Sequence, residues 1–137
     1  LSLIFLHLHN ALGQYVYTDE DDTKRYFTLE SGSTYKDEYG ADLTLTKNAD
    51  GTFTIKDKQD NILNFTASGY LNVIKDSSGN ALTLSYNGAD LKTITDGAGR
   101  VTTFNLDASG RLTSIVDPAG QTTSYAYSSG LLQSITY

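Results

Sequence analysis

Two histidines, sixteen carboxylates and ten tyrosines are the side chains that could support chemistry in this 137-residue chain. His7 and His9 would share one face of a strand, as two zinc ligands might, but no third histidine and no cysteine exists, and zinc sites use three or four protein ligands. The acids at residues 19–22 lack the alternating ligands and the glycine of an EF-hand loop. We therefore predict no metal site, and interpret these residues as strand positions and a solvated hairpin turn.

The carboxylates that recur along the chain are better explained as turn residues than as catalytic acids. Asp76, Asp96 and Asp117 follow one another at intervals of about twenty residues, whereas a catalytic acid is normally unique and lies in a pocket that perturbs its pKa. The sequence has no Gly-x-Ser-x-Gly nucleophile elbow, and both histidines stand near one end. We expect no catalytic residue, no cofactor and no enzyme activity.

The charge balance excludes two classes of partner. The formal net charge is -6 and the sequence pI is about 4.6, so the surface repels phosphate backbones and anionic lipid headgroups. The apolar run at residues 1–8 lacks a basic leader and is far short of the roughly 20 residues of a membrane helix. We predict a strand there, no nucleic-acid partner and no membrane insertion. Because the chain begins with Leu rather than Met, we expect it to be a piece of a longer protein.

A tandem repeat organises the second half of the chain. The pattern Leu-x-x-Ile-x-Asp-x-x-Gly begins at Leu71, Leu91 and Leu112, and a partial copy begins at Leu132, in steps of 20, 21 and 20 residues. The fifth and seventh positions after each glycine are apolar or aromatic, which is the period of a strand with one buried face. The predicted repeat core is Leu71, Ile74, Leu84, Tyr86, Leu91, Ile94, Phe104, Leu106, Leu112, Ile115, Tyr125, Tyr127, Leu132 and Ile135.

Four-residue links between these strands have the composition of tight turns. Each begins with an aspartate, whose carboxylate can accept a bond from the backbone N–H two residues on, and ends with a glycine that tolerates positive φ. Pro118 is the only proline and takes the second position, where a type I turn accepts its fixed φ. The predicted structural turn residues are Asp76, Gly79, Asp96, Gly99, Asp117, Pro118 and Gly120. Turns are also expected at 87–88, 107–110 and 128–130.

The spacing within the repeat leaves one question open. A leucine and an isoleucine three residues apart would point to opposite faces of a regular strand. Either a β-bulge lies between them, or the leucine belongs to the preceding turn.

The predicted fold is all-β, with antiparallel hairpin repeats of about 20 residues in an extended sheet. Residues 1–58 are interpreted as irregular leading hairpins and residues 59–137 as regular repeats, within one continuous domain. The terminal units of repeat proteins are usually atypical.

Three segments resemble the YD repeats of bacterial Rhs and wall-associated proteins, which also occur in insecticidal toxin complexes and teneurins. They are Asp96–Phe104, with its Gly-Arg and Thr-Thr-Phe, the segment 117–127, and the stretch 15–27, which is similar to the lead-in of the wall-associated branch. The resemblance is strong over residues 60–137. Leu106 departs from it, because the family often has tyrosine there.

This resemblance implies a spiral of hairpins that, in complete family members, closes into a hollow shell around a C-terminal cargo, often a toxin. The later motif by which family members release that cargo is not in this sequence. We therefore expect a structural wall segment, extracellular or on the bacterial cell surface, whose partner is the rest of its own longer chain.

Two alternatives come from other classes of protein. Open strand edges would let identical subunits join head to tail as a self-assembling fibre. Exposed tyrosine rings would suit sugar stacking, which would make the chain an adhesin for cell-surface glycans, with Tyr86, Tyr125 and Tyr127 as the rings at repeat positions.

Overall fold

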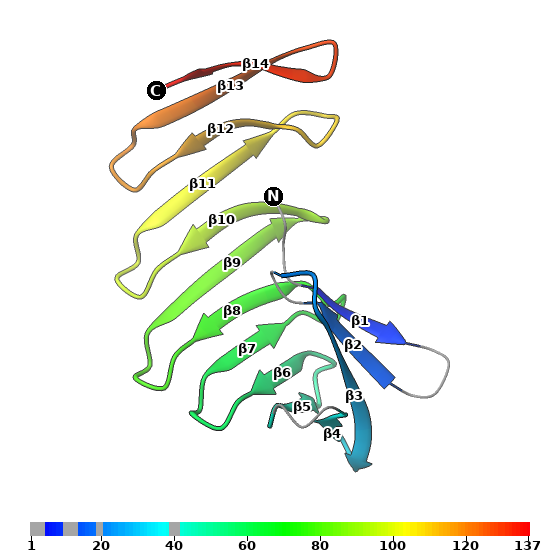
Figure 1. The fold of residues 1–137 in the computed structure, drawn as a ribbon. Coiled ribbons are helices and arrows are strands. Elements are labelled where there is room, and N and C mark those ends of the chain that lie inside the picture. The colour runs from blue at the N-terminus through cyan, green and yellow to red at the C-terminus, as the bar shows by residue number, and fades with distance from the viewer. Residues whose placement is uncertain (1–4, 10–13, 19–20, 39–41) are drawn as a thin grey trace. The chain divides into compact units, whose positions relative to one another are not determined.

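The computed structural model describes residues 5–9, 14–18, 21–38 and 42–137, and their regular structure consists of β-strands (Figure 1). Every strand pair with a defined register is antiparallel, and the paired strands are consecutive in the sequence. The predicted all-β fold of antiparallel hairpins is therefore confirmed. None of the described segments forms a helix with the length and apolarity required to cross a membrane.

The chain divides into two compact units, residues 1–81 and 82–137. The predicted change from leading hairpins to regular repeats, at residues 58 and 59, lies inside the first unit. In its described residues the first unit contains eight strands: β1 (Phe5–His9), β2 (Gln14–Thr18), β3 (Lys24–Ser31), β4 (Thr34–Asp37), β5 (Thr44–Lys47), β6 (Phe53–Lys56), β7 (Ile62–Phe65) and β8 (Leu71–Lys75). The second contains β9 (Ala81–Asn87), of which only Ala81 belongs to the first unit, β10 (Asp90–Thr95), β11 (Val101–Leu106), β12 (Leu112–Val116), β13 (Thr122–Ser128) and β14 (Leu131–Thr136).

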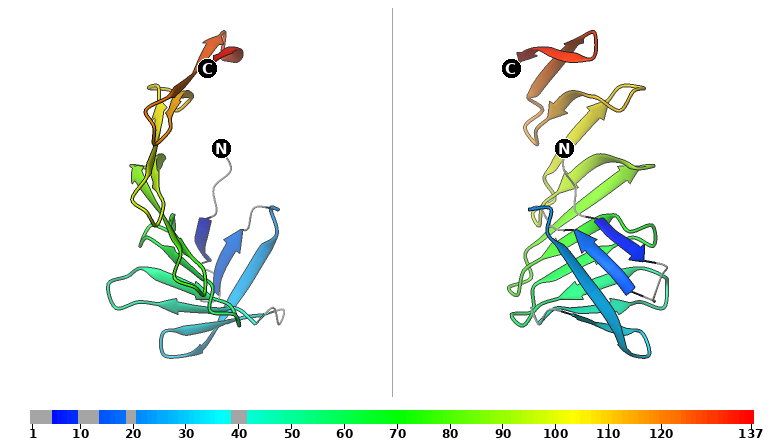
Figure 2. Two further views of the ribbon diagram at one scale, coloured as in Figure 1. Left: turned by 90° about the vertical axis from the view of Figure 1, so that its left-hand side faces the viewer. Right: turned by 45° about the vertical axis from the view of Figure 1, so that its right-hand side comes forward.

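The first unit is two layers thick. Strands β2 and β3 face strands β6 to β8 across a common core (Figure 2). Aromatic rings join the two layers: the ring centroids of Tyr15 and Phe53 are 5.0 Å apart, and those of Tyr17 and Phe65 are 5.8 Å apart. The core consists of Tyr15, Tyr17, Phe27, Leu45, Phe53, Ile55, Phe65 and Leu71. Alternation along each strand places these side chains on one face of the sheet.

The second unit is a single layer of six strands. Leu84, Leu91 and Phe104 are its buried apolar residues, and its other apolar side chains are half-buried or exposed. The apolar side chains become more exposed towards the end of the chain, where Leu131 and Tyr137 retain 74% and 92% of their surface in contact with solvent. Each unit is therefore built from antiparallel strand pairs, but the first unit has two layers and the second has one.

A β-bulge lies between the leucine and the isoleucine of each repeat, which settles the question that the sequence left open. In β8, Leu71 pairs with Phe65 and Val73 pairs with Asn64, so the residue between them has no partner in the ladder. The same register shift occurs in β10, β12 and β14. The extra residue shifts the alternation of side chains by one position, so the leucine and the isoleucine lie on the same face of the sheet. The four bulged residues are Asn72, Lys92, Thr113 and Gln133.

Candidate functional site

The feature that recurs most often is a five-residue corner between strands. In each corner the first residue donates its backbone N–H to the carbonyl of the fifth, and the fourth donates its N–H to the carbonyl of the first, at 2.8–3.3 Å. This is a type I turn with one extra residue in the left-handed region, a common three-residue hairpin loop. The described corners begin at Asn48, Asp57, Thr66, Asp76, Asp96, Asp107 and Asp117.

The aspartate of the corner holds the turn through one carboxylate oxygen. Asp76 Oδ1 accepts the backbone N–H of Ser78 at 2.9 Å and that of Asn80 at 3.0 Å. Asp96 and Asp117 make the equivalent pair of bonds at 2.8–3.0 Å. The bond to the second residue on is the one expected from the sequence, whereas the bond to the fourth residue on was not predicted.

The other carboxylate oxygen binds the side chain of the fifth residue. Asp76 Oδ2 accepts Asn80 Nδ2 at 2.9 Å, and Asp96 Oδ2 accepts Arg100 Nε at 2.7 Å. The side-chain amide of Asn80 holds the pKa of Asp76 below its ordinary value, and the backbone N–H of Arg100 does the same for the pKa of Asp96. These carboxylates are therefore ionised at neutral pH and are unsuited to act as general acids. The sequence signal for this bond is the Asn or Arg directly after the glycine.

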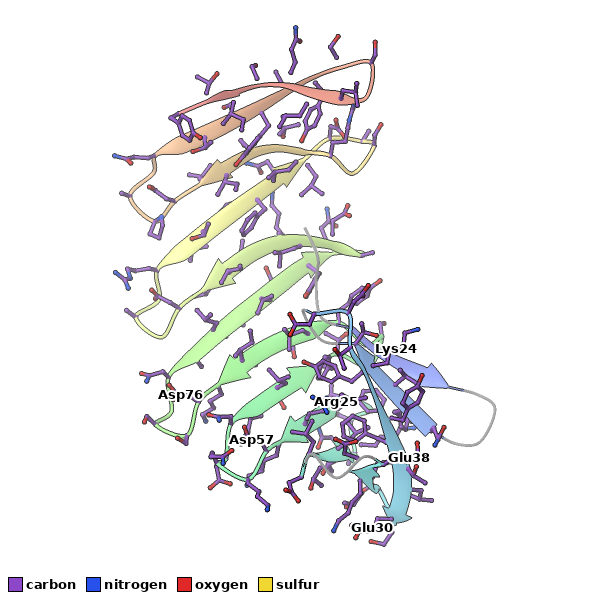
Figure 3. The ribbon with its side chains drawn as sticks, viewed as in Figure 1. Lys24, Arg25, Glu30, Glu38, Asp57 and Asp76 are labelled. Carbon is purple, nitrogen blue, oxygen red and sulfur yellow. The ribbon has the colours of Figure 1, made fainter. Side chains whose placement is uncertain are left out.

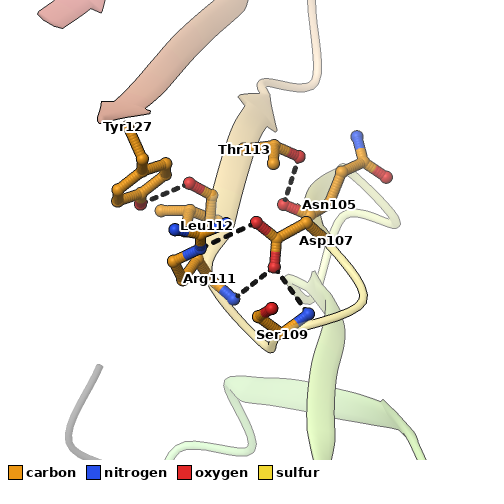
Figure 4. Close-up of polar contacts among 7 residues, drawn as sticks. All are labelled: Asn105, Asp107, Ser109, Arg111, Leu112, Thr113 and Tyr127. Carbon is orange, nitrogen blue, oxygen red and sulfur yellow. Dashed lines mark hydrogen bonds and ion pairs between the residues drawn. The ribbon is translucent and has the colours of Figure 1, made fainter. Parts of the chain in front are cut away.

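The connection at residues 107–111 is a full corner of the same kind, although the sequence suggested only a return turn (Figure 4). Asp107 accepts the backbone N–H groups of Ser109 and Arg111 and binds Arg111 Nε at 2.9 Å. The backbone N–H of Arg111 is the main cause that lowers the pKa of Asp107. The guanidinium also lies 5.0 Å from the ring centroid of Tyr127, whose hydroxyl donates to the carbonyl of Leu112 at 2.6 Å. Arg111 thereby links its corner to β13.

The fourth residue of every corner adopts positive φ. The angle is 89° at Gly79, 81° at Gly99 and 84° at Gly120, and Pro118 takes the second position of its corner. A side chain is rarely accepted there. Asp60 is the exception, since it occupies the glycine position of its corner at φ 64°.

The predicted repeat-core residues pair with one another directly across strands. Leu84 lies opposite Ile94, and Tyr86 lies opposite Leu91. The remaining pairs follow the same scheme: Phe104 with Ile115, Leu106 with Leu112, Tyr125 with Ile135, and Tyr127 with Leu132. Directly opposite residues share a face, so these twelve side chains form one surface, which we call the apolar face of the second unit. In the first unit, Leu71 and Ile74 pair with Phe65 and Leu63 on its core face.

Burial along this predicted core is uneven. Leu71, Leu84, Leu91 and Phe104 are buried, and the residues from Leu106 to Tyr127 are half-buried. Leu132 and Ile135 are more exposed and retain 53% and 42% of their surface. Strand β14 pairs with β13 alone, and no second layer of the unit covers it among the described residues.

The opposite side of the second unit carries short polar side chains. Asn105 Nδ2 donates to Ser114 Oγ at 3.0 Å, Lys92 Nζ donates to Asn105 Oδ1 at 2.8 Å, and the hydroxyls of Ser85 and Thr93 bond across strands. The sheet is therefore apolar on one face and hydrogen-bonded on the other.

The predictions about metals concern residues that are described only in part. The backbone of His7 and His9 belongs to β1, and Asp21 and Asp22 lie in a turn, whereas residues 19 and 20 fall outside the described residues. Across the described ranges, no three His, Cys, Asp or Glu side chains gather as metal ligands would.

Comparison with known families gives a match in the second unit. Residues 86–122 and 107–137 each match the family model described as RHS Repeat. Compared with curated proteins, the chain has no match. The two matched segments contain the corners that begin at Asp96, Asp107 and Asp117.

Proposed function

Because residues 86–137 of this chain belong to the RHS-repeat (YD-repeat) family, we propose that the chain is a wall segment of a bacterial surface or secreted YD-repeat protein that encloses or delivers a toxin, or makes cell contact. RHS repeats are structural rather than catalytic, and proteins that carry them are generally extracellular or associated with the cell surface. The proposal adds the bacterial source, the enclosed cargo and the location of this particular chain.

The observation that carries the proposal is the two-sided character of the second unit. Its apolar face consists of six cross-strand pairs, while its other face is a network of Ser, Thr and Asn hydrogen bonds. A wall needs one surface for its contents and a different surface for solvent. Large apolar surfaces exposed on soluble proteins commonly mark interaction sites, so the apolar face suits the inner side of a shell.

The corners support the same role, because the hydrogen bonds that close each corner come from that repeat alone. Each corner is closed by bonds among five consecutive residues, so a hairpin can be added without contacts from elsewhere in the chain. Stability in repeat proteins is approximately a sum of unit terms and neighbour terms. We propose that successive hairpins extend the sheet into a spiral wall.

Electron microscopy of the full-length encoded polypeptide tests this proposal. We expect closed, hollow particles in which a C-terminal segment resists added protease until the shell is opened by mild denaturant. Solid filaments that grow with protein concentration would favour the fibre alternative instead. A monodisperse open sheet that binds immobilised glycans, and loses that binding when Tyr125 and Tyr127 are replaced by Ala, would favour the adhesin alternative.

A further inference from the structure

The first unit contains a pocket that the wall function does not use. Its volume is about 380 Å³. It is bounded by Tyr17 and Arg25, which belong to the layer of β2 and β3 (the covering layer), and by β6, β7 and β8 of the opposite layer. Its aliphatic lining includes Ile55, Leu63 and Ile74. Pockets of this volume accept small molecules, with a few polar groups that fix orientation.

Arg25 is an unusual residue for its position on β3. It pairs directly opposite Tyr17 and precedes Phe27 by two residues, and both of these aromatic side chains are buried in the core. The alternation of the strand therefore turns a half-buried guanidinium toward the core side. Among the described residues, the ion pairs engage other cations, and Arg25 has no acidic partner. This half-buried guanidinium therefore has donors available for an anion in the pocket.

Lys75 ends β8 at the pocket wall, and no salt bridge with another described residue involves it. Its side chain is exposed and alternates with that of Ile74, which faces the core. The guanidinium of Arg25 is therefore the cation that favours a carboxylate or a similar anion here, since charge-assisted hydrogen bonds are about twice as strong as neutral ones.

Two carboxylates complete the charged lining. Asp57 and Asp76 begin neighbouring corners, which are joined by a bond from the backbone N–H of Ser77 to Asn61 Oδ1 at 3.2 Å. Figure 3 labels Asp57 and Asp76 at two corners on one edge of the sheet, and Arg25 towards the middle of the unit. In each aspartate Oδ1 accepts two backbone N–H groups of its own corner, whereas Oδ2 accepts one side-chain donor and keeps a lone pair for a further donor. The pocket thus presents a guanidinium, anionic acceptors and an aliphatic wall.

We propose that this pocket binds an apolar α-amino acid, either free or as the last residue of a peptide. Its α-carboxylate bonds Arg25, its N–H groups donate to Asp57 and Asp76, and its side chain packs on Ile55, Leu63 and Ile74. This ligand class satisfies both signs of charge and the aliphatic wall at once, whereas a simple anion leaves the carboxylates and the wall without a partner. The inference stands apart from the wall function, because it concerns the first unit alone.

Titration of the ¹⁵N-labelled chain with defined probes tests the ligand class. The probes are L-leucine, N-acetyl-Gly-Gly-Leu, the same peptide with a C-terminal amide, and N-acetyl-Gly-Gly-Gly. We expect saturable shifts of amides in β3, β7 and β8 with leucine, with the Leu-terminated peptide acid, or with both. The amide and the triglycine are expected to bind at least about tenfold more weakly, because each lacks one of the required groups. Binding of leucine alone assigns a free amino acid, and binding of the peptide acid alone assigns a chain terminus.

A matched pair of variants tests the role of the guanidinium. R25Q keeps the aliphatic stem and removes the charge, and we expect it to weaken binding at least about tenfold. K24Q removes the charge of the adjacent exposed residue, which does not line the pocket, and we expect unchanged affinity. Equal thermal unfolding of the two variants and the parent shows that the fold is kept. No saturable shift with any probe, undiminished binding by R25Q, or an equal loss in K24Q would each overturn the proposal.

Discussion

Phe65 and Phe104 are buried rings, one in each unit, but they have different surroundings. Phe65 is completely buried, with the Tyr17 ring of the covering layer 5.8 Å from its own. Phe104 pairs with Ile115 within a single layer and keeps 9% of its surface exposed. The corners, in contrast, are the same in both units. The comparison teaches that the corner is a local property of five residues, whereas burial depends on whether a second layer is present.

The largest expected effect separates the two units. F65A should lower the free energy of unfolding of the first unit by about 3–5 kcal/mol, because a fully buried ring leaves a cavity between two layers. F104A should cost the second unit about 2 kcal/mol, because solvent reaches the vacated site. Hydrogen exchange of the amides in β7 and β11 measures each unit separately. Equal losses would contradict the difference in layering.

Replacement of a corner glycine should have the same effect in both units. G79V and G99V each place a β-branched side chain at positive φ, 89° and 81° in the parent, and an added Cβ would meet no atom within 4 Å at either position. The cost is therefore backbone strain without a clash, about 2 kcal/mol in each unit. Urea unfolding followed by hydrogen exchange measures both losses. A loss confined to one unit would show that the presence of a second layer, and not the corner itself, determines the loss of stability.

Removal of the corner carboxylate should be a smaller and again equal change. D76A and D96A each remove the acceptor of two backbone N–H groups and of one side-chain donor. The groups in these exposed corners can bond to water instead, so we expect each loss of stability to be smaller than the loss from a glycine replacement. Thermal unfolding of the two single variants and of the double variant checks that the effects are equal and additive.

Acid should weaken the corners of both units over the same range of pH. Hydrogen bonds lower the pKa values of Asp57 and Asp76 in the first unit and of Asp96 and Asp107 in the second. A folded-state pKa below the unfolded value of 3.8 stabilises the fold above that value, and this contribution is lost as pH falls through the folded pKa. Stability should therefore decrease below about pH 4. Denaturant titrations from pH 6 to pH 2 measure this decrease, and D76A should reduce its slope in the first unit.

The smallest expected effect concerns the one described corner that has no glycine at its fourth position. D60G should stabilise the first unit by about 0.5 kcal/mol, because it relieves an aspartate held at φ 64°. The exposed Lys56–Asp60 ion pair of 3.0 Å is lost as well, but such pairs contribute little. D60N removes that pair and still tolerates positive φ, so it serves as the control, with unchanged stability. A loss of stability in D60G would contradict the strain assigned to this corner.

The sequence was sufficient where the structure is determined locally. Alternating apolar residues and the Asp-to-Gly links predicted the antiparallel hairpins, because both patterns act within one or two strands. The bulge after each repeat leucine could only be left as one of two alternatives, since a register shift depends on the partner strand. The sequence also placed Leu132 and Ile135 with the core, because periodicity predicts which face a residue occupies but not whether that face is covered.

The site in the first unit was beyond prediction for a similar reason. Tyr17 and Arg25 come to the same pocket as Asp76 because β2 and β3 lie across strands some fifty residues further along the sequence. No local pattern specifies such a contact between layers. Arg25 also breaks the apolar alternation of its strand, and this irregularity is the one sequence signal that could have drawn attention to it.

The regular position of the β-bulge has a consequence for how such a chain can change in length. Each repeat of about twenty residues carries one unpaired position, at Asn72, Lys92, Thr113 and Gln133. Duplication of a whole repeat would therefore also copy its β-bulge, and every side chain downstream would keep its original orientation. Insertion of a single residue into a strand would instead invert all that follows. Genes for such chains can grow or shrink by complete hairpins, and their two surfaces keep their chemical character at any length.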